Sequence, residues 1–326
     1  MTRRLPAPAL SLLTLGLALA APAYCWGPQG HAAVGVAGSA GLTPNARAHV
    51  IKILGDDNLA AVASWMDQAR SAVFHDGPLA HDPEVLKFNA DFRHNGEWHY
   101  VDLPLGTPAY TLDDPFAKPD DVVHELEAAV DRLEGKGDPK LTQREALFMI
   151  IHLVGDLHQP LHTANGYFVV NPDSSVQLVT DPAAAKELPN DKGGNTDFYG
   201  PGKYDELHAY WDGDLPEKVA GSKDAAALAA IMEKRIAADG GSWKTPGDYH
   251  HWPEAWATES LIAARTAYAG IVFGKETEWP KGGIKRIEIT FPPNYDATCV
   301  PLAAERLAKA GYHLAEILNA IQWSDQ

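Results

Sequence analysis

Cysteine is scarce in this sequence of 326 residues, which contains only Cys25 and Cys299. Cys25 ends a segment that we expect to be removed, so the mature chain would keep Cys299 alone. A single cysteine cannot form an intramolecular disulfide, and no Asn-x-Ser/Thr sequence offers a glycan site. Stability must then come from a hydrophobic core, for which about 300 residues are enough. Both absences favour a bacterial exported protein over a eukaryotic secreted one.

The apolar run near the N-terminus is too short for an ordinary transmembrane helix. This run, Leu10–Ala20, follows two arginines and precedes small residues, which is the order of an export signal. We expect residues 1–25 to be a signal peptide, with cleavage after Cys25 leaving Trp26 as the N-terminus. Bulky Tyr24 disfavours a lipid anchor at Cys25, and the lack of an amphipathic pattern disfavours a buried first helix. The sequence predicts a periplasmic or secreted protein without membrane anchoring.

Basic residues are few: 27 Lys and Arg oppose 43 Asp and Glu, and the net charge is −16. Removal of the two leader arginines would make the chain more acidic still. Proteins that hold nucleic acid through many phosphate contacts are basic on the binding face. No Lys/Arg cluster is present here, so that mode of binding is excluded. Any phosphate must be attracted locally, and a metal cluster is the obvious source of positive charge.

Helical patterns dominate the rest of the sequence. Thr43-Pro44 is typical of a helix start, with a capping side chain before a first-turn proline. The predicted helices cover Gly30–Ala40, Thr43–Leu54, Leu59–Arg70, Asp120–Leu133, Thr142–Leu157, Ala225–Ala237, Pro253–Ile271 and Pro301–Ile321. Only Ile284–Phe291 alternates like a strand, with Val176–Thr180 as a possible partner. No linker or repeat marks a boundary, so we predict one mainly α domain over residues 26–326 with a minor β-hairpin.

Residues 163–194 differ in character from the helical segments. They carry Asn, Asp, Pro and Gly throughout. We predict a long loop or flap here, because long loops in compact domains are usually functional or mobile.

Two His-x-x-x-Asp pairs carry the strongest chemical signal. His152 and Asp156 are four residues apart, as are His208 and Asp212, so each pair faces one way on a helix. A proline after the first pair ends or kinks the helix and leaves His162 free to turn into the same site. One such pair is as often a solvated helix face or a buried hydrogen bond. Two pairs with a flanking histidine indicate a zinc site of nitrogen and carboxylate ligands without cysteine.

Further motifs lie in order along the chain. They are Trp26-Gly-x-x-Gly-His31, Ser64-Trp-Met-Asp67, Trp98-His-Tyr-Val-Asp102, the run from His152 to His162, Gly193-Gly-Asn195 and His208-x-x-Trp-Asp212. Together they resemble the zinc-dependent single-strand-specific nucleases of fungi, plants and bacteria, whose helical fold is shared with bacterial zinc phospholipase C. The resemblance spans essentially the whole mature chain. It implies a single-domain, multi-helix fold of that type.

The resemblance also implies three zinc ions held by nine residues. The first ion would be held by Asp67, His99, His152 and Asp156. The second would be held by His162, His208 and Asp212. The third would be held by the α-amino nitrogen and carbonyl oxygen of Trp26 together with His31, while Asp156 bridges it to the first. A free amine at Trp26 exists only after cleavage, so processing would complete this site.

Physical chemistry agrees with the implied scheme. Two zinc ions that share an aspartate can lower the pKa of a water between them toward neutrality. A third can hold the phosphate and stabilise the departing 3′ oxygen. Six positive charges against three aspartates would leave a cationic pocket in an acidic protein. Such a pocket suits flexible strands and small nucleotides better than a rigid duplex.

Other residues are expected to support catalysis and substrate binding. Arg70 lies three residues after Asp67 on the same helix face; both are predicted to be catalytic, and the resemblance assigns Arg70 to the pentavalent phosphate. The alternative for Arg70 is a surface ion pair. Tyr100 and Asp102 match a base-binding pair in which the ring stacks on a nucleobase; core packing and a loop cap are the alternative. Asn195 is expected to reach the phosphate or a ligand, or to serve only as a turn residue.

These observations predict an exported three-zinc phosphodiesterase that cleaves single-stranded RNA and DNA to 5′-phosphorylated products. A 3′-nucleotidase activity and a monomeric state are also expected. A zinc phospholipase C is the alternative, disfavoured because Asp212 stands where phospholipases carry glutamate and because Tyr100 and Asp102 are present. A protein with purely structural zinc is disfavoured because three-ligand sites leave open positions. The segment 163–194 is longer than in the fungal enzymes, and their disulfides are absent.

Overall fold

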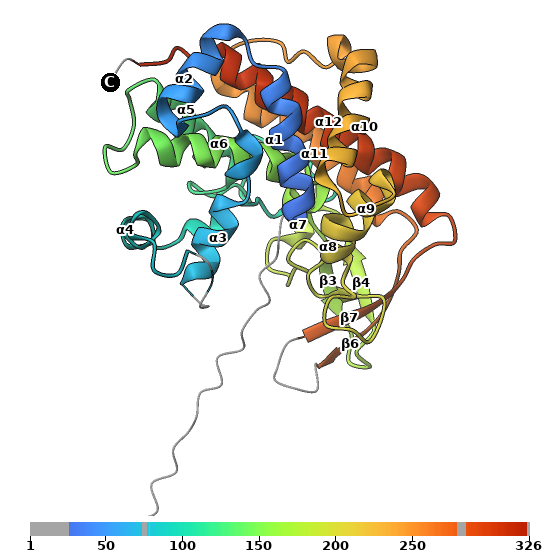
Figure 1. The fold of residues 1–326 in the computed structure, drawn as a ribbon. Coiled ribbons are helices and arrows are strands. Elements are labelled where there is room, and N and C mark those ends of the chain that lie inside the picture. Colours follow the sequence, from blue (N-terminus) through green and yellow to red (C-terminus); the bar gives the residue numbers. More distant parts are fainter. Residues whose placement is uncertain (1–25, 74–76, 78, 279–284, 325–326) are drawn as a thin grey trace, which may run out of the picture.

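Helix α6 (Gln143–His158) lies at the centre of the molecule (Figure 1). The computed structural model describes residues 26–73, 77, 79–278 and 285–324, so the predicted signal peptide lies outside the described residues. Every residue from Glu145 to His158 is buried. Among the helices that pack on α6 are α1 (Gly27–Ala40), α5 (Val122–Leu133), α11 (Trp252–Tyr268) and α12 (Tyr295–Ala320). The most apolar helix predicted from the sequence is therefore the core of the fold.

Local sequence signals set both ends of α6. At its start the Thr142 hydroxyl accepts the Glu145 amide at 3.1 Å, and the Glu145 carboxylate accepts the Thr142 amide at 2.8 Å. This reciprocal capping satisfies two amides that have no partner within the helix. At its end the chain turns at Pro160 into a short 3-10 helix, η3 (Pro160–His162). The prediction that Pro160 ends the helix before His162 is confirmed.

Shorter helices complete a mainly α fold, as the sequence predicted. They are α2 (Pro44–Leu54), η1 (Leu59–Ala61), α3 (Trp65–Ala72), α4 (Pro83–Asp91), η2 (Asn95–Glu97), α7 (Pro182–Ala185), α8 (Leu207–Ala209), η4 (Tyr210–Asp214), α9 (Leu215–Ala220), α10 (Ala225–Asp239), η5 (Gly240–Ser242) and η6 (Tyr249–His251). Capping side chains accept amides at several starts, among them Thr43 at α2 and Asp121 at α5. Among the described helices, none combines the length and apolarity needed to cross a membrane.

The predicted continuous helix over Leu59–Arg70 is wrong. The chain instead forms η1, breaks, and resumes as α3 at Trp65. At the break the Ala63 carbonyl accepts the Nδ1–H of His152 at 2.7 Å. A carbonyl inside a regular helix would be taken by the amide four residues on. The break therefore frees an acceptor for a histidine 89 residues away.

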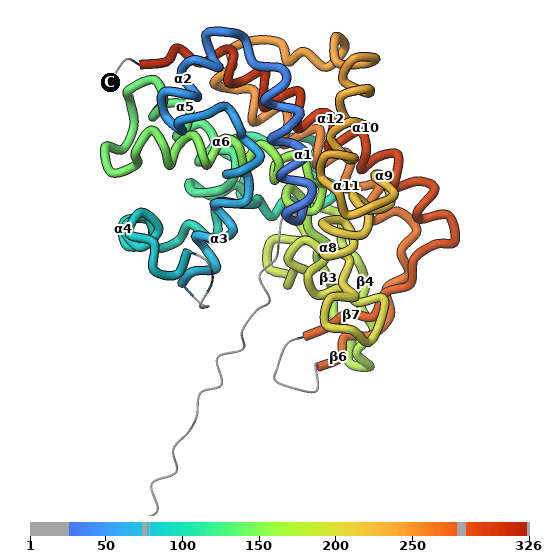
Figure 2. Tube along the Cα trace, viewed as in Figure 1, coloured from blue at the N-terminus to red at the C-terminus, as the bar shows by residue number. Residues whose placement is uncertain are grey.

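Strands β3, β4, β6 and β7 lie together at one end of the helical body (Figures 1 and 2). Two antiparallel pairs form, β3 (Tyr167–Val170) with β4 (Val176–Val179) and β6 (Val272–Glu278) with β7 (Lys285–Thr290). Short strand β5 (Asp197–Phe198) pairs with β7, and β1 (Leu103–Pro104) pairs with β2 (Ala164–Asn165).

The predicted pairing of Val176–Thr180 with Ile284–Phe291 is therefore wrong. Val176–Val179 forms a hairpin with β3 and Lys285–Thr290 forms a hairpin with β6, and closing a hairpin costs less loop-closure entropy than pairing these two distant segments. The two hairpins still touch, because the Phe168 and Phe273 rings lie 5.0 Å apart and Ser175 bridges to Lys275. The segment 163–194 thus contains strands and the short helix α7; its role as a flap stays a prediction.

Candidate metal centre

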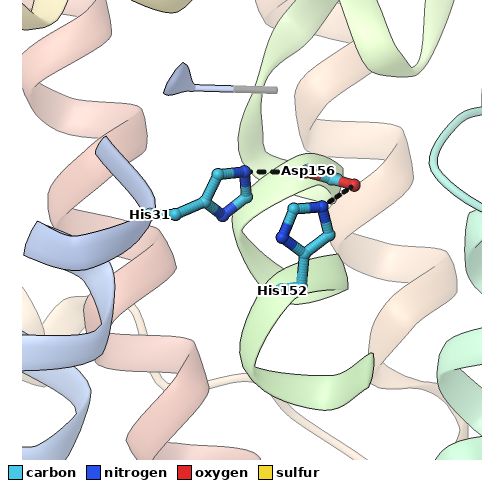
Figure 3. Close-up of side chains that lie close together, drawn as sticks. All are labelled: His31, His152 and Asp156. Atoms are coloured by element: carbon cyan, nitrogen blue, oxygen red, sulfur yellow. Dashed lines mark ion pairs between the residues drawn. The ribbon is translucent and has the colours of Figure 1, made fainter. Parts of the chain in front are cut away.

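Helix α6 presents His152 and Asp156 on one face, one turn apart. Both side chains are fully buried, and His152 Nε2 lies 3.2 Å from Asp156 Oδ2. Helix α1 brings His31 to the same place, with Nε2 3.2 Å from Asp156 Oδ1 (Figure 3). The His31 and His152 rings stack with centroids 4.0 Å apart. A Cβ on Gly155 would lie 2.8 Å from His31 Nδ1, so this close approach requires glycine.

Two further side chains complete this first donor group. His99 Nδ1 lies 2.9 Å from Asp156 Oδ2 and 3.1 Å from His152 Nε2. Asp67, on α3, places Oδ1 3.9 Å from His152 Nε2 and 4.0 Å from His99 Nδ1. Asp156 is at the centre, because one oxygen faces His31 and the other faces His99 and His152. The first donor group is thus Asp67, His31, His99, His152 and Asp156.

The second donor group consists of His162, His208 and Asp212. Their donor atoms lie within 4.8 Å of one another, and His208 Nε2 is 3.2 Å from Asp212 Oδ2. His208 lies on α8, but Asp212 lies on η4, which is a π-helical turn and not the regular helix that the sequence pattern suggested. Such turns occur frequently at functional sites. The spacing of four residues still brings the pair together.

Backbone carbonyls orient three of the histidines. The Nδ1 atoms of His152, His162 and His208 each lie 2.7 Å from a carbonyl oxygen, belonging to Ala63, His99 and Gly193 respectively. Each Nδ1 must carry the proton to make this bond, which leaves the Nε2 lone pair facing the centre. Metal-binding histidines are usually held in this way.

Burial and charge prepare the donors for a cation. Burial lowers the pKa of four histidines, which are His31, His99, His162 and His208; for His99 and His208 the values are about 4 and about 3. They are therefore neutral near pH 7, the form that coordinates metal. Burial also opposes protonation of His152, but the charges of Asp156 and Asp67 outweigh it and raise the pKa of His152 to about 8. The negative charge of Asp156 and Asp67, which favours the proton on His152, would equally attract a cation bound at the centre.

Several buried donor atoms make no hydrogen bond within the described part of the chain. They are His31 Nε2, Asp156 Oδ1, His162 Nε2 and His208 Nε2; the first two face each other at an ion-pair distance of 3.2 Å, as His208 Nε2 faces Asp212 Oδ2. Burying polar atoms without partners is costly, so an arrangement that exposes lone pairs to one small volume points to a bound ion. Imidazole and carboxylate donors without sulfur fit zinc. The residues present therefore fit the group that the sequence implied.

Trp26 begins the described chain beside the second donor group. Its side chain is fully buried and its ring lies 6.4 Å from that of Trp211. Its carbonyl accepts the Gly30 amide at 2.9 Å, and a Cβ on Gly27 would lie 3.0 Å from the Asp212 carbonyl oxygen. The tight start of α1 thus places the predicted N-terminal residue near predicted ligands; coordination by its amine and carbonyl stays a prediction.

Arg70 lies at the edge of the first donor group. One guanidinium nitrogen is 3.1 Å from Asp67 Oδ1, and the side chain is 17% exposed. Its stem packs on Gly96, where a Cβ would lie 3.3 Å from Arg70 Cδ. The ion pair that the sequence left as an alternative exists, and it joins Arg70 to a predicted ligand.

The Tyr100 and Asp102 side chains have neighbours that the sequence did not single out. Asp102 Oδ1 accepts the Asn165 amide at 2.8 Å, and Asp102 Oδ2 lies 3.8 Å from Lys118 Nζ. The same ammonium lies 5.8 Å from the Tyr100 ring centre. Neither Lys118 nor Asn165 belongs to one of the sequence motifs, so the sequence could not have identified them.

Asn195 makes a turn contact in this structure, because its side-chain amide donates to the Lys192 carbonyl at 2.6 Å. Gly193, in the same turn, has φ of +63°, and a Cβ there would lie 2.3 Å from the Leu161 carbonyl oxygen. This turn supplies the carbonyl that holds His208. The two glycines before Asn195 therefore serve the second donor group through the backbone.

Gln159 is a further residue that the sequence did not predict. It is fully buried and donates to Asp212 Oδ1 at 2.8 Å. His158, one residue before, bonds the Val154 carbonyl and His313 instead.

Comparison with known proteins places this centre in a family. A family model described as S1/P1 Nuclease matches residues 26–322. The chain is 26% identical to Endonuclease 1 of Arabidopsis thaliana over 73% of this chain and 72% of that protein. It is 24% identical to Nuclease P1 of Penicillium citrinum (92% of this chain, 99% of that protein) and 24% identical to Nuclease S1 of Aspergillus oryzae (98% of each). Because the family model spans nearly all of the described chain, this chain belongs to the S1/P1 nuclease family.

Proposed function

We propose that this protein is a zinc-dependent endonuclease that hydrolyses single-stranded RNA and DNA to 5′-phosphorylated products and also removes 3′-phosphates from nucleotides. The observation that carries the proposal is the convergence of eight buried His and Asp side chains on two adjoining donor groups. Relatives named as nucleases and endonucleases support the same reaction class.

Three zinc ions would be held by the residues already described. The first donor group would hold two ions bridged by Asp156, one of them completed by Trp26, and the second donor group would hold the third. Bound zinc would polarise the phosphate and supply a nucleophile from water near neutral pH. The chain's part is to keep four of the five imidazoles neutral, to fix the orientation of three of them through backbone carbonyls, and to exclude bulk water.

Arg70 would stabilise charge on the phosphate. Its guanidinium lies beside Asp67 at the edge of the centre and is partly exposed, so an incoming phosphate can reach it. A planar cation with several donors matches two phosphate oxygens at once. Asn195 would assist from the neighbouring turn.

Tyr100 and Asp102 would bind a nucleobase. The Tyr100 ring offers a stacking face, and Asp102, held by Asn165, offers an acceptor for a base edge. Bases in a duplex have their faces and edges occupied, which supports a preference for single strands. The acidic chain needs few other phosphate contacts, because its positive charge is concentrated at the metal centre.

We also propose export and processing at Cys25–Trp26, giving a bacterial periplasmic or secreted monomer without a membrane anchor. The start of α1 supports this, because Gly27 packs on the Asp212 carbonyl and the Trp26 ring lies near Trp211, so cleavage before Trp26 would release an amine close to the predicted ligands.

The test is to assay the chain beginning at Trp26 on heat-denatured and duplex DNA while its bound metal is counted. We expect acid-soluble nucleotides mainly from denatured DNA, loss of activity with a chelator, and recovery with zinc.

The His208→Ala variant should lose activity. The His251→Ala variant should keep it, because His251 is exposed and lies outside the two donor groups. Faster release of phosphocholine from lecithin than of nucleotides would replace the proposal with a phospholipase C. An inert protein with bound metal would replace it with structural zinc.

A further inference from the structure

Gln159 occupies the junction between the two donor groups. It follows α6, and its backbone amide donates to the Asp156 carbonyl at 2.9 Å. Its own carbonyl accepts the amide of His162 at 3.0 Å. The residue is fully buried, so these bonds do not compete with water. The backbone of Gln159 thus sets the path from a residue of the first group to a residue of the second.

The side chain of Gln159 uses both ends of its amide. Oε1 accepts the Leu161 amide at 2.6 Å and caps η3, the short helix that carries His162. Nε2 donates to Asp212 Oδ1 at 2.8 Å. Asp212 is 53 residues further along the chain, on a separate element. One buried amide therefore joins the helix that carries one donor to the carboxylate of another.

This contact limits the orientation of Asp212. With Oδ1 held by Gln159, the other oxygen, Oδ2, faces His208 Nε2 at 3.2 Å. A buried carboxylate with only one oxygen anchored to the protein leaves the second for a ligand. Outer partners of this kind fix the geometry of metal-binding carboxylates.

We propose that Gln159 is a positioning residue that holds Asp212 in the orientation in which the second donor group binds its metal ion. The inference rests on the proposed function, since it requires that this group binds an ion. Glutamine meets the geometry because it accepts from Leu161 and donates to Asp212 at the same time. An ionised glutamate could only accept, and leucine could do neither.

The two roles of the amide can be separated by substitution. Gln159→Glu keeps an acceptor for the Leu161 amide but places a carboxylate against Asp212. Gln159→Leu removes both bonds at similar volume. Gln143→Leu is the matched control, because Gln143, the first residue of α6, also donates a side-chain bond, to Ser324 at 2.8 Å. It lies at the opposite end of the helix from both donor groups.

The experiment measures zinc per chain after dialysis and zinc affinity by competition with a chromophoric chelator. We expect Gln159→Glu and Gln159→Leu to bind one ion about 10–100-fold more weakly, as outer-partner substitutions typically do, while the control keeps wild-type affinity. Saturating zinc should restore much of the activity of Gln159→Glu.

Wild-type zinc affinity in Gln159→Glu would contradict the inference and leave Gln159 with a capping role. Unfolding of Gln159→Glu that excess zinc does not reverse would also contradict it, because a positioning defect must yield to mass action. If the wild-type chain itself binds no zinc, the proposed function fails first. If wild type binds zinc and cleaves single strands but Gln159→Glu is unchanged, this inference alone fails.

Discussion

The first donor group depends on a small residue as well as on its histidines and aspartates. Gly155 stands between His152 and Asp156 on α6, and the His31 ring lies against it. Any side chain there would occupy the place of that ring. The first donor group therefore depends on a residue that donates nothing to a metal.

Gly155→Ala should weaken the first donor group. The added Cβ would lie 2.8 Å from His31 Nδ1, so either the ring or α1 must move. Overpacking in a buried place typically costs about 1–3 kcal/mol, and a displaced ligand should lower zinc affinity. Thermal unfolding and zinc titration measure the two effects. Gly241→Ala is the control, since a Cβ at Gly241 would meet no atom within 4 Å. Equal zinc affinity in Gly155→Ala and wild type would contradict the prediction.

A second residue-scale feature is a buried carboxyl pair, Asp191 and Asp197, on either side of the Gly193–Asn195 turn. Asp191 accepts from Gly166 at 3.0 Å and from the Tyr268 hydroxyl at 2.8 Å. Asp197 lies beside it, and both side chains are fully buried. Burial raises the pKa of Asp191 to about 6 and raises that of Asp197 well above its usual range. The pair thus holds a proton that the unfolded chain would release.

Asp197→Asn should make stability less dependent on pH. A raised pKa in the folded state means that the stabilisation is complete at acid pH, below the unfolded value of 3.8, and is lost as pH rises toward the folded value. The contribution of Asp197 to wild-type stability should therefore fall on going from about pH 5 to about pH 8, by up to about 1.4 kcal/mol per pH unit for one retained proton, and the variant should lack this contribution. Asparagine can donate to Asp191 without titrating. Urea unfolding across this range measures the slope, and an equal slope in the variant would disprove the assignment.

At the scale of elements, the sequence predicted those features that depend on interactions between residues close together in the chain. The caps and proline of α6 act within a few residues, so the helix, its end and the His152–Asp156 pair were all predictable. The break between η1 and α3 was not, because it depends on His152 reaching the Ala63 carbonyl across 89 positions. The role of Gln159 was hidden for the same reason, since its partner Asp212 is distant in sequence. Family resemblance supplied predicted ligand positions such as His99 that no local spacing revealed.

The β3–β4 hairpin is the element by which the segment 163–194 could affect substrate access. Its outer residues Val169 and Val170 are 38% and 37% exposed, and the Ser174 carbonyl accepts the Glu276 amide at 2.7 Å. Replacing residues 170–176 by a two-residue Asn-Gly turn removes this end without touching the buried Phe168.

We expect the shortened hairpin to fold, with a loss of about 1 kcal/mol for the missing hydrogen bond. If the segment narrows the substrate groove, kcat/KM for long single strands should rise relative to that for 3′-mononucleotides. The ratio of the two values, measured on one preparation, cancels differences in active fraction. An unchanged ratio would exclude the flap role.

At the scale of the whole molecule, the two donor groups connect most of the helical body. Their residues come from α1, α3, α6, η3, α8 and η4, together with His99 in the segment after η2. These elements are distributed along the first two thirds of the chain and are brought together around buried, mutually close carboxylates and imidazoles. A net charge of −16 adds to the repulsion among the carboxylates. Bound cations would therefore stabilise the fold as well as serve the reaction.

Chelation should lower the thermal stability of the whole chain and not only its activity. An ion that binds only the folded state at 100 times its dissociation constant contributes about 2.7 kcal/mol of stability. For about 300 residues the entropy of unfolding is about 0.6 kcal/mol/K, so each kcal/mol corresponds to roughly 1.6 °C and removal of one such ion should lower Tm by about 4 °C. Differential scanning calorimetry with and without a chelator measures the shift.

Asp156→Asn is the informative comparison, because Asp156 contacts His31, His99 and His152. The chelator should shift the Tm of this variant less than that of wild type. Equal Tm values with and without chelator in wild type would show that the fold does not depend on metal.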